Sequence, residues 1–204
     1  MTTRARPLRK DARRNRDRLV ESARALFARQ GLDVALEEIA RAAGVSIGTL
    51  YNHFPRRADL VEEVFADRVD TVARIAEHAL TLEPWPGLVH FLERVCELQA
   101  ADRGYNELVS RPAGAHRHGY ELMSRILARA KEDGALRADI TLEDMAFVTW
   151  GTSRTVEAVG AVRPELWRRH LAILLDGLRA DAAHPLPEPP MRPEELARVL
   201  RGDC

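Results

Sequence analysis

Residues 44–48 read Gly-Val-Ser-Ile-Gly, the spacing at which hydrolases place a nucleophilic serine between two glycines. In that chemistry the serine stands on a sharp turn between a strand and a helix, and backbone N–H groups nearby bind the oxyanion. Here a helical pattern precedes Ser46, and no strand-like alternation occurs in the chain. We therefore predict that the chain is not an enzyme, and retain a serine hydrolase using Ser46 as an alternative.

Five histidines raise the question of a metal site: His78, His90, His116, His118 and His170. His116 and His118 are two residues apart, which is not the i, i+4 spacing of helical ligands, and no cysteine or carboxylate cluster completes a set. We expect this pair in a flexible polar loop, where a pH-sensing or ligand-contact role stays open. Cys96 and Cys204 form no metal or disulfide pattern, and Cys96 should be a buried small hydrophobe. We predict no metal and no cofactor.

A third group of polar side chains follows a glycine turn within residues 31–60. Two short helices flank Gly44, where positive φ would cost glycine little, and Ala40 is small where the helices would cross. The internal contacts of such a motif would come from Ile39, Ala40, Ala43, Val45, Leu50 and Phe54. The outward face of the second helix would carry Ser46, Thr49, Tyr51, Asn52 and His53. A helix-turn-helix lays this face in the DNA major groove, so we predict a DNA-binding protein.

Helical periodicity accounts for almost the whole chain, so we predict an all-α fold. Gly31 should end the first helix, and Thr141 to Asp144 form a capping box. Residues 84–87, Pro-Trp-Pro-Gly, should break the pattern. The helix over 57–80 would extend ~36 Å and connect a DNA-binding head to a separate body. The predicted helices cover residues 12–30, 36–43, 47–53, 57–80, 88–101, 103–109, 117–132, 142–159, 165–180 and 193–201.

Residues 12–60 resemble the amino-terminal domain of TetR-type (tetracycline-repressor-like) transcriptional regulators. The resemblance rests on Ile39-Ala40, Ala43-Gly44-Val45-Ser46, Gly48-Thr49-Leu50-Tyr51, His53-Phe54 and Leu60. Beyond this stretch the chain is similar to the family by architecture alone. The resemblance implies a three-helix DNA-binding domain followed by a helical domain that binds a ligand and dimerises.

The resemblance implies that Tyr51 and His53 contact phosphates, while Ser46 and Thr49 are short hydrogen-bonding groups on the outward face. Ile47, Gly48 and Asn52 lie where base edges could be read, since glycine admits close approach and Asn pairs with adenine. Arg56 and Arg57, at the start of the long helix, favour phosphate. The alternative for each of these residues is an ordinary surface side chain.

Ala35 departs from the family pattern, in which a threonine caps the first motif helix and touches a phosphate. Alanine cannot cap, and losing such a cap costs ~0.5–2 kcal/mol. Glu38 could still return to the backbone N–H in half of a capping box. We expect the basic amino-terminal arm to supply the missing phosphate contact.

The helical body should enclose a largely apolar small-molecule effector, as the resemblance implies, although an ordinary core is the alternative. The expected lining is Trp85, Phe91, Met123 and Trp150, with polar contacts from Arg111, His118 and Tyr120. The last two long helices carry more apolar surface than one face needs, which favours a homodimer over internal packing alone. The expected dimer residues are Trp150, Val156, Val159, Trp167, Leu171, Leu174 and Leu178, and Gly151 and Ala158 would permit close approach.

Charge is distributed unevenly along the chain, although Lys plus Arg equals Asp plus Glu at 31 each. Residues 1–20 carry eight basic residues against two aspartates, so they sum to +6 and the remainder sums to −6. A basic arm on an acidic body suits a polyanion contact at one end, whereas the alternative is a solvated tail. The expected domains are a basic flexible arm (1–11), a helix-turn-helix DNA-binding domain (12–56), a ligand-binding and dimerisation domain (57–180) and a Pro-rich tail with a short helix (181–204).

We therefore predict a cytoplasmic, homodimeric transcriptional regulator, a repressor released from a palindromic operator by a small molecule. No signal-peptide pattern or bilayer-length apolar run is present in this sequence. A constitutive or architectural DNA-binding protein without a ligand is the main alternative.

Overall fold

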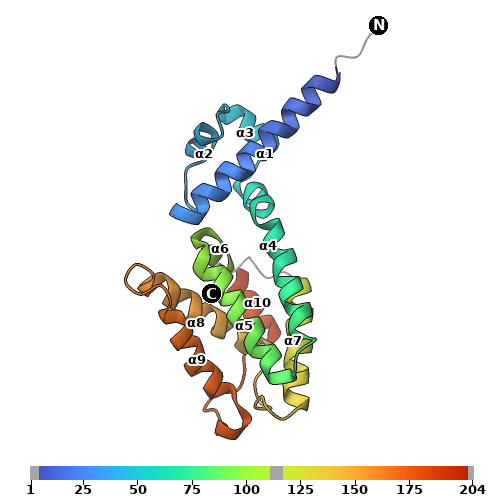
Figure 1. Cartoon of the computed structure of the whole chain (residues 1–204), viewed down its shortest axis with the longest axis vertical. Helices are drawn as coiled ribbons and strands as arrows, with labels where there is room; N and C mark the ends of the chain where they lie inside the picture. The colour runs from blue at the N-terminus through green and yellow to red at the C-terminus, as the bar shows by residue number, and fades with distance from the viewer. Residues whose placement is uncertain (1–4, 111–116, 202–204) are drawn as a thin grey trace. The chain divides into compact units, whose positions relative to one another are not determined.

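The structure, a computed structural model, describes residues 5–110 and 117–201 (Figure 1). Over these ranges the regular elements are helical, which confirms the all-α prediction; an isolated bridge joins Leu136 to Arg179. The helices are α1 (Ala5–Gln30), α2 (Leu36–Ala42), α3 (Ile47–His53), α4 (Arg57–Ala79), α5 (Pro84–Ala101), α6 (Arg103–Ser110), α7 (Arg117–Glu132), α8 (Leu142–Val159), α9 (Leu166–Leu178), the 3₁₀ turn η1 (Ala180–Ala182) and α10 (Pro193–Arg201).

Two helix starts differ from the sequence prediction. α1 begins at Ala5 rather than near residue 12, so part of the expected flexible arm is helical. α5 begins at Pro84 rather than near 88, because prolines in a first helical turn need no N–H donor there. Gly87 is buried in this turn, and a Cβ at this position would lie 2.4 Å from the Ala79 carbonyl oxygen. The Pro-Trp-Pro-Gly segment therefore starts a helix instead of breaking one.

The predicted glycine end of α1 and the predicted capping box at the start of α8 are confirmed, whereas the helix predicted over 165–180 ends at Leu178 and is followed by η1. Gly31 has a φ of 88° and follows α1, and Gly134 has a φ of 77° after α7. Thr141 Oγ1 accepts from the Asp144 N–H, and Asp144 Oδ2 accepts from the Thr141 N–H at 2.7 Å, which completes the capping box.

The chain packs as two compact units, and the first extends to Arg68 and also contains Asp102–Glu107. In this unit α2 and α3 lie beside one another against α1 (Figure 1). Its core is apolar and fully buried at Leu19, Phe27, Ile39, Leu50, Phe54 and Leu60. The sequence predicts that the DNA-binding domain ends at residue 56, whereas the first packing unit also contains the first turns of α4 and most of α6.

The second unit comprises Val69–Ala101 and the chain from Leu108 onward. α8 and α9 lie side by side, and α5 contacts α7, α8 and α9 (Figure 1). Arg129 of α7 donates to the carbonyl oxygens of Leu80 and Leu82 at 2.7 and 2.9 Å, which ties α7 to the end of α4. The core includes Leu88, Leu92, Cys96, Ile126, Leu136, Trp167 and Leu171.

Arg137 binds the chain that follows η1. Its guanidinium donates to both carboxylate oxygens of Asp139 and to the His184 carbonyl oxygen at 2.6 Å. Further on, α10 buries Leu196. None of the helices in the described residues is long and apolar enough to cross a bilayer.

Candidate functional site

The turn between α2 and α3 has the conformation that the sequence predicted. Gly44 has a φ of 64°, in the left-handed region that favours glycine. Arg18 of α1 donates through Nε to the Ala43 carbonyl oxygen at 2.8 Å and through Nη2 to the Gly44 carbonyl oxygen at 2.8 Å. These bonds satisfy carbonyl groups at the end of α2 and place positive charge where the helix dipole favours it. The turn is therefore fixed to α1.

Ser46 is exposed, as expected, and it also caps α3. Its Oγ accepts from the Thr49 N–H at 3.1 Å and lies 2.9 Å from Thr49 Oγ1. Tyr51 and Asn52 are exposed, and Tyr51 is 48 % exposed despite its large ring. Gly48 is also exposed, so the open surface of α3 consists of a glycine, an amide and a phenol.

The remaining predicted DNA-contact residues differ in solvent exposure and in the partners of their side chains. Ile47 and His53 are half-buried, and the His53 ring lies 6.4 Å from that of Phe54. Arg56 is exposed and pairs with Asp59, whose hydrogen bond raises the pKa of the Arg56 guanidinium. Phosphate contact by these side chains stays a prediction.

Arg57 points into its own unit instead of outward. Its Nη1 donates to the Leu32 carbonyl oxygen and its Nη2 to the Val34 carbonyl oxygen, both at 2.6 Å. A guanidinium held in this way braces the segment between α1 and α2. The geometry therefore favours a structural role for Arg57 over the phosphate contact expected from the sequence.

The start of α2 lacks a side-chain cap, as Ala35 implied. The half capping box expected from Glu38 does not form, because Glu38 Oε1 accepts from Gln30 Nε2 of α1 at 3.0 Å. Two backbone bonds, from Glu38 N and Ile39 N to the Ala35 carbonyl oxygen, begin the helix.

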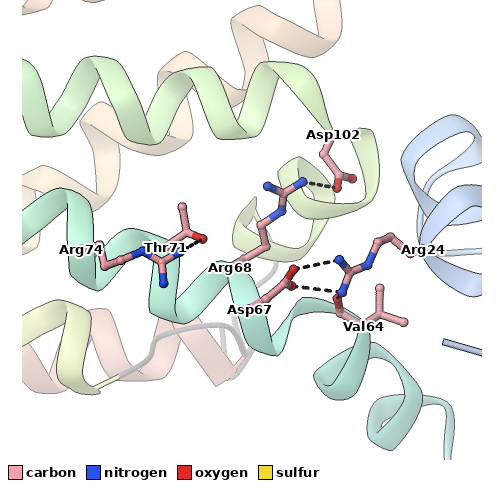
Figure 2. A network of polar contacts seen from close by, with 7 residues as sticks. All are labelled: Arg24, Val64, Asp67, Arg68, Thr71, Arg74 and Asp102. Carbon is pink, nitrogen blue, oxygen red and sulfur yellow. Dashed lines mark hydrogen bonds and ion pairs between the residues drawn. The ribbon is translucent and has the colours of Figure 1, made fainter. Parts of the chain in front are cut away.

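A polar network that sequence reasoning missed joins α4 to α1 and to the α5–α6 junction (Figure 2). Arg24 of α1 donates to both carboxylate oxygens of Asp67 and to the Val64 carbonyl oxygen. Arg68 Nη2 donates to Asp102 Oδ2 at 3.2 Å, and Asp102 Oδ1 accepts from the Tyr105 N–H. An aspartate directly before a helix is a recognisable capping signal, and it could have drawn attention to Asp102.

Tyr105 links this polar network to the apolar core of the first unit. Its ring lies 6.0 Å from that of Phe65, and burial raises the pKa of its hydroxyl to about 12.

The residues proposed to line a ligand site are dispersed through the second unit. Phe91 and Met123 are buried in its core, whereas Trp85 is half-buried at the start of α5 with the Arg179 guanidinium 5.1 Å from its ring centroid. Half-buried Trp150 packs edge-on against Phe147. Arg111 and His116 lie outside the described residues, and so do the side chains of His118 and Tyr120. The lining set stays a prediction.

Buried polar groups in the same unit were not predicted. Gln99 is 2 % exposed, and its Oε1 lacks a hydrogen-bond partner within the described parts of the chain. The burial of Gln99 could have been predicted, because Gln99 is a polar residue that continues the apolar stripe of Leu88, Leu92 and Val95. Burial raises the pKa of the neighbouring Cys96 thiol to about 12, although a hydrogen bond with Thr152 opposes the rise. Across residues 5–110 and 117–201 no cluster of three or more potential metal ligands occurs.

The predicted dimer residues divide into two groups. Trp167, Leu171 and Leu178 are buried in the core of their own chain, because the 3.6-residue period turns them toward α5 and α8. Internal packing, the alternative considered for the last two helices, therefore accounts for these three. Trp150, Val156, Val159 and Leu174 are half-buried. Phe147 and Ile173, at 43 % and 60 % exposure, are the large apolar side chains that α8 and α9 leave open.

Comparison with known proteins identifies the class. Residues 19–64 match the family model for bacterial regulatory proteins of the tetR family, and residues 83–180 match the SbtR-like transcriptional regulator carboxy-terminal domain. The HTH-type transcriptional repressor KstR2 of Rhodococcus jostii is 28 % identical over 80 % of this chain and 90 % of its own.

Two solved structures extend the comparison. A TetR transcriptional regulator from Streptomyces coelicolor is 30 % identical, with 80 % of this chain and 98 % of that chain covered and a TM-score of 0.50. The fold is also shared with FadR of Thermus thermophilus, solved with lauroyl-CoA, at 21 % identity, 86 % and 100 % coverage and a TM-score of 0.55. The helix-turn-helix and the helical body define a DNA-binding transcriptional regulator. This chain belongs to the TetR family.

Proposed function

We propose that this protein is a transcriptional repressor that binds a palindromic operator as a homodimer and releases it when a small molecule occupies its helical body. The observation that carries the proposal is the open face of α3, where Gly48, Tyr51 and Asn52 are exposed while Leu50 and Phe54 anchor the helix inside. The repressor activity named for KstR2 supports the direction of regulation. The protein would act in the cytoplasm, where bacterial DNA lies.

DNA recognition would divide between backbone and base contacts. Tyr51 and His53 would donate to phosphates, and Arg56 would add charge beside them. Asn52 would pair with a base edge, and Gly48 would let the helix backbone approach the groove closely. Because Ser46 and Thr49 bond each other, their main contribution would be to hold the start of α3, with phosphate contacts made from that fixed position.

Dimerisation would use the outer faces of α8 and α9. Phe147 and Ile173 are exposed apolar side chains, and a Cβ at exposed Gly177 would meet nothing within 4 Å. A second copy packed here would cover apolar surface that one chain leaves in water. Two α3 helices must then lie about 34–36 Å apart, or a multiple of that, to read two half-sites.

The effector would bind in the second unit among apolar residues such as Phe91 and Met123, with Gln99 as a buried acceptor. A ligand that prefers a helix arrangement with the wrong half-site spacing shifts the population away from the DNA-bound form. α4 would transmit this shift, because its residues up to Arg68 belong to the first unit and the rest belong to the second.

Two measurements test this proposal together. Selection of bound sequences from random DNA should yield a palindrome, and a thermal-shift screen of metabolites should yield a compound that stabilises the protein and releases the selected duplex. A palindrome with no such compound would favour the constitutive DNA-binding alternative. Recovery of no preferred sequence would overturn the repressor proposal.

A serine hydrolase is the alternative that Ser46 raised, and Ser46→Ala separates the two. The variant should only weaken DNA binding, because it removes the cap of α3. Loss of an esterase activity present in the wild type would instead support the hydrolase. The regulatory family of the chain and the capping bond of Ser46 favour the first outcome.

A further inference from the structure

The segment between α1 and α2 is held by a carboxylate from α6. Glu107 Oε2 accepts from the Leu32 N–H at 2.7 Å, while its Oε1 accepts from Arg103 Nε at 2.9 Å. The Glu107 side chain is 20 % exposed, so the bond to Leu32 is partly shielded from water. A hydrogen bond from a backbone N–H to an ionised carboxylate is stronger than one to a neutral acceptor.

The position of the Glu107 carboxylate requires a glycine at residue 31. Its φ of 88° lies in the left-handed region, and a Cβ built there would stand 2.2 Å from Glu107 Oε1. Glycine at residue 31 therefore serves two purposes: it ends α1, and it leaves room for the carboxylate to reach the next N–H. The following carbonyl groups, Leu32 and Val34, are held from α4 by Arg57.

The contacts of Glu107 and Arg57 with residues 32–34 lie directly before the uncapped start of α2. Ala35 offers no side-chain acceptor, and α2 has only seven residues, too few for a stable helix without support. Ile39 and Ala40 of α2 pack in the core of the unit, and α3 follows after the turn at Gly44. A displacement of the start of α2 is therefore passed on to α3.

We propose that Glu107 is a positioning residue for DNA binding, whose carboxylate fixes Leu32 and so replaces the cap that Ala35 cannot provide. Glu107 touches no DNA in this proposal; it acts through Leu32 and α2. The inference rests on DNA binding by the wild-type protein, and it extends that function to a residue on α6.

The test is a double-mutant cycle in the full-length protein, with the duplex selected from random DNA as the probe. Glu107→Ala should lower affinity about tenfold, whereas Glu107→Gln, which keeps an acceptor oxygen, should stay within about threefold of wild type. Ala35→Ser restores a cap; in the Glu107→Ala background it should recover most of the lost affinity, and in the wild type it should change affinity less than about twofold.

Arg103→Ala is the matched control, because it removes the exposed partner of Glu107 and leaves the bond to Leu32. It should leave affinity near the wild-type value. Amide hydrogen exchange provides the readout that a general loss of stability would not reproduce. Glu107→Ala should accelerate exchange at Leu32 and across α2 without matching acceleration in α9, and Ala35→Ser should restore protection of α2.

Two outcomes would overturn the proposal. Equal gains from Ala35→Ser in both backgrounds would show a direct phosphate contact by the serine, with no link to Glu107. Unchanged DNA affinity in Glu107→Ala would show that Leu32 needs no such support. Failure of the wild type to bind any duplex would count against the proposed function itself, so the two failures are distinguishable.

Discussion

Asp102 Oδ2 lies 3.2 Å from Arg68 Nη2, and the other oxygen of the same carboxylate accepts from the Tyr105 N–H at 3.0 Å. The Asp102 side chain, 5 % exposed, thus pairs with Arg68 of α4 (Figure 2) and also caps α6. We expect Asp102→Ala to lower the free energy of unfolding by about 1–3 kcal/mol, because the substitution removes both a cap and a partly buried ion pair. Urea unfolding followed by circular dichroism measures the change.

Arg74→Ala is a suitable control for this prediction, since Arg74 is exposed and donates to Thr71 one turn away on α4. Its effect should stay within about 0.5 kcal/mol. An Asp102→Ala protein as stable as the Arg74→Ala protein would show that the Asp102 contacts add nothing to the fold.

Tyr51→Ala should weaken binding to the selected duplex and to random DNA by the same factor, about tenfold, as expected for a phosphate contact. Its 48 % exposure implies little change in thermal stability. Fluorescence anisotropy on both duplexes measures the two affinities. A loss confined to the selected duplex would instead assign Tyr51 to base recognition.

Removal of residues 1–10 should lower DNA affinity and flatten its salt dependence. These residues contain Arg4, Arg6, Arg9 and Lys10, and the slope of log affinity against log salt should become shallower by about 0.9 for each phosphate that the arm neutralises. A full-length variant with these four residues changed to Gln controls for chain length. An unchanged slope would mean that the arm contacts no phosphate.

Gly48→Ala should stabilise the protein while it weakens DNA binding. A Cβ at Gly48 would meet Ser46 Oγ at 3.8 Å, so alanine fits and should add about 0.5–1 kcal/mol of stability to the helix. The new methyl group would stand on the face that approaches the groove, and binding should fall by at least about threefold.

Gly44→Ala provides the contrast, because Gly44 has a φ of 64° and its Cβ would lie 2.9 Å from Arg18 Nη2. That variant should lose stability by about 1–2 kcal/mol. Thermal unfolding and anisotropy separate the two glycines. A Gly48→Ala protein that binds DNA as well as wild type would remove Gly48 from the recognition surface.

Ile173→Glu should dissociate the proposed dimer. Residue 173 is 60 % exposed in one chain, and the proposed interface would bury the new carboxylate without a partner. Sedimentation velocity should show a monomer that is still helical. Leu186→Glu, at a residue 49 % exposed in the Pro-rich segment, should leave the assembly unchanged. An Ile173→Glu protein that remains a dimer would place the interface elsewhere.

Local signals explain why most helix boundaries could be predicted. The glycine turns at Gly31 and Gly44 and the capping box at Thr141 depend on the chemistry of neighbouring residues, and the structure confirms all three. The break predicted at residues 84–87 is wrong, because Pro84 and Pro86 are compatible with a first helical turn as well as with a helix break.

Side-chain roles that depend on distant partners were harder to predict. The position of Arg57 at a helix start predicts a phosphate contact, yet its hydrogen bonds go to the Leu32 and Val34 carbonyl oxygens. The size and apolar character of Trp167 and Leu171 favour a dimer interface, but the helical period turns both side chains into the core of their own chain.

The sequence by itself determined the helical class, the helix-turn-helix and the family resemblance, because periodicity, turn glycines and short motifs are properties of neighbouring residues. Only the tertiary structure decided that Asp102 and Glu107 belong to the DNA-binding unit, since each lies more than thirty positions from its partner, Arg68 in one case and Leu32 in the other. A hydrogen bond depends on position in space, and folding brings together groups whose separation along the chain gives no local signal.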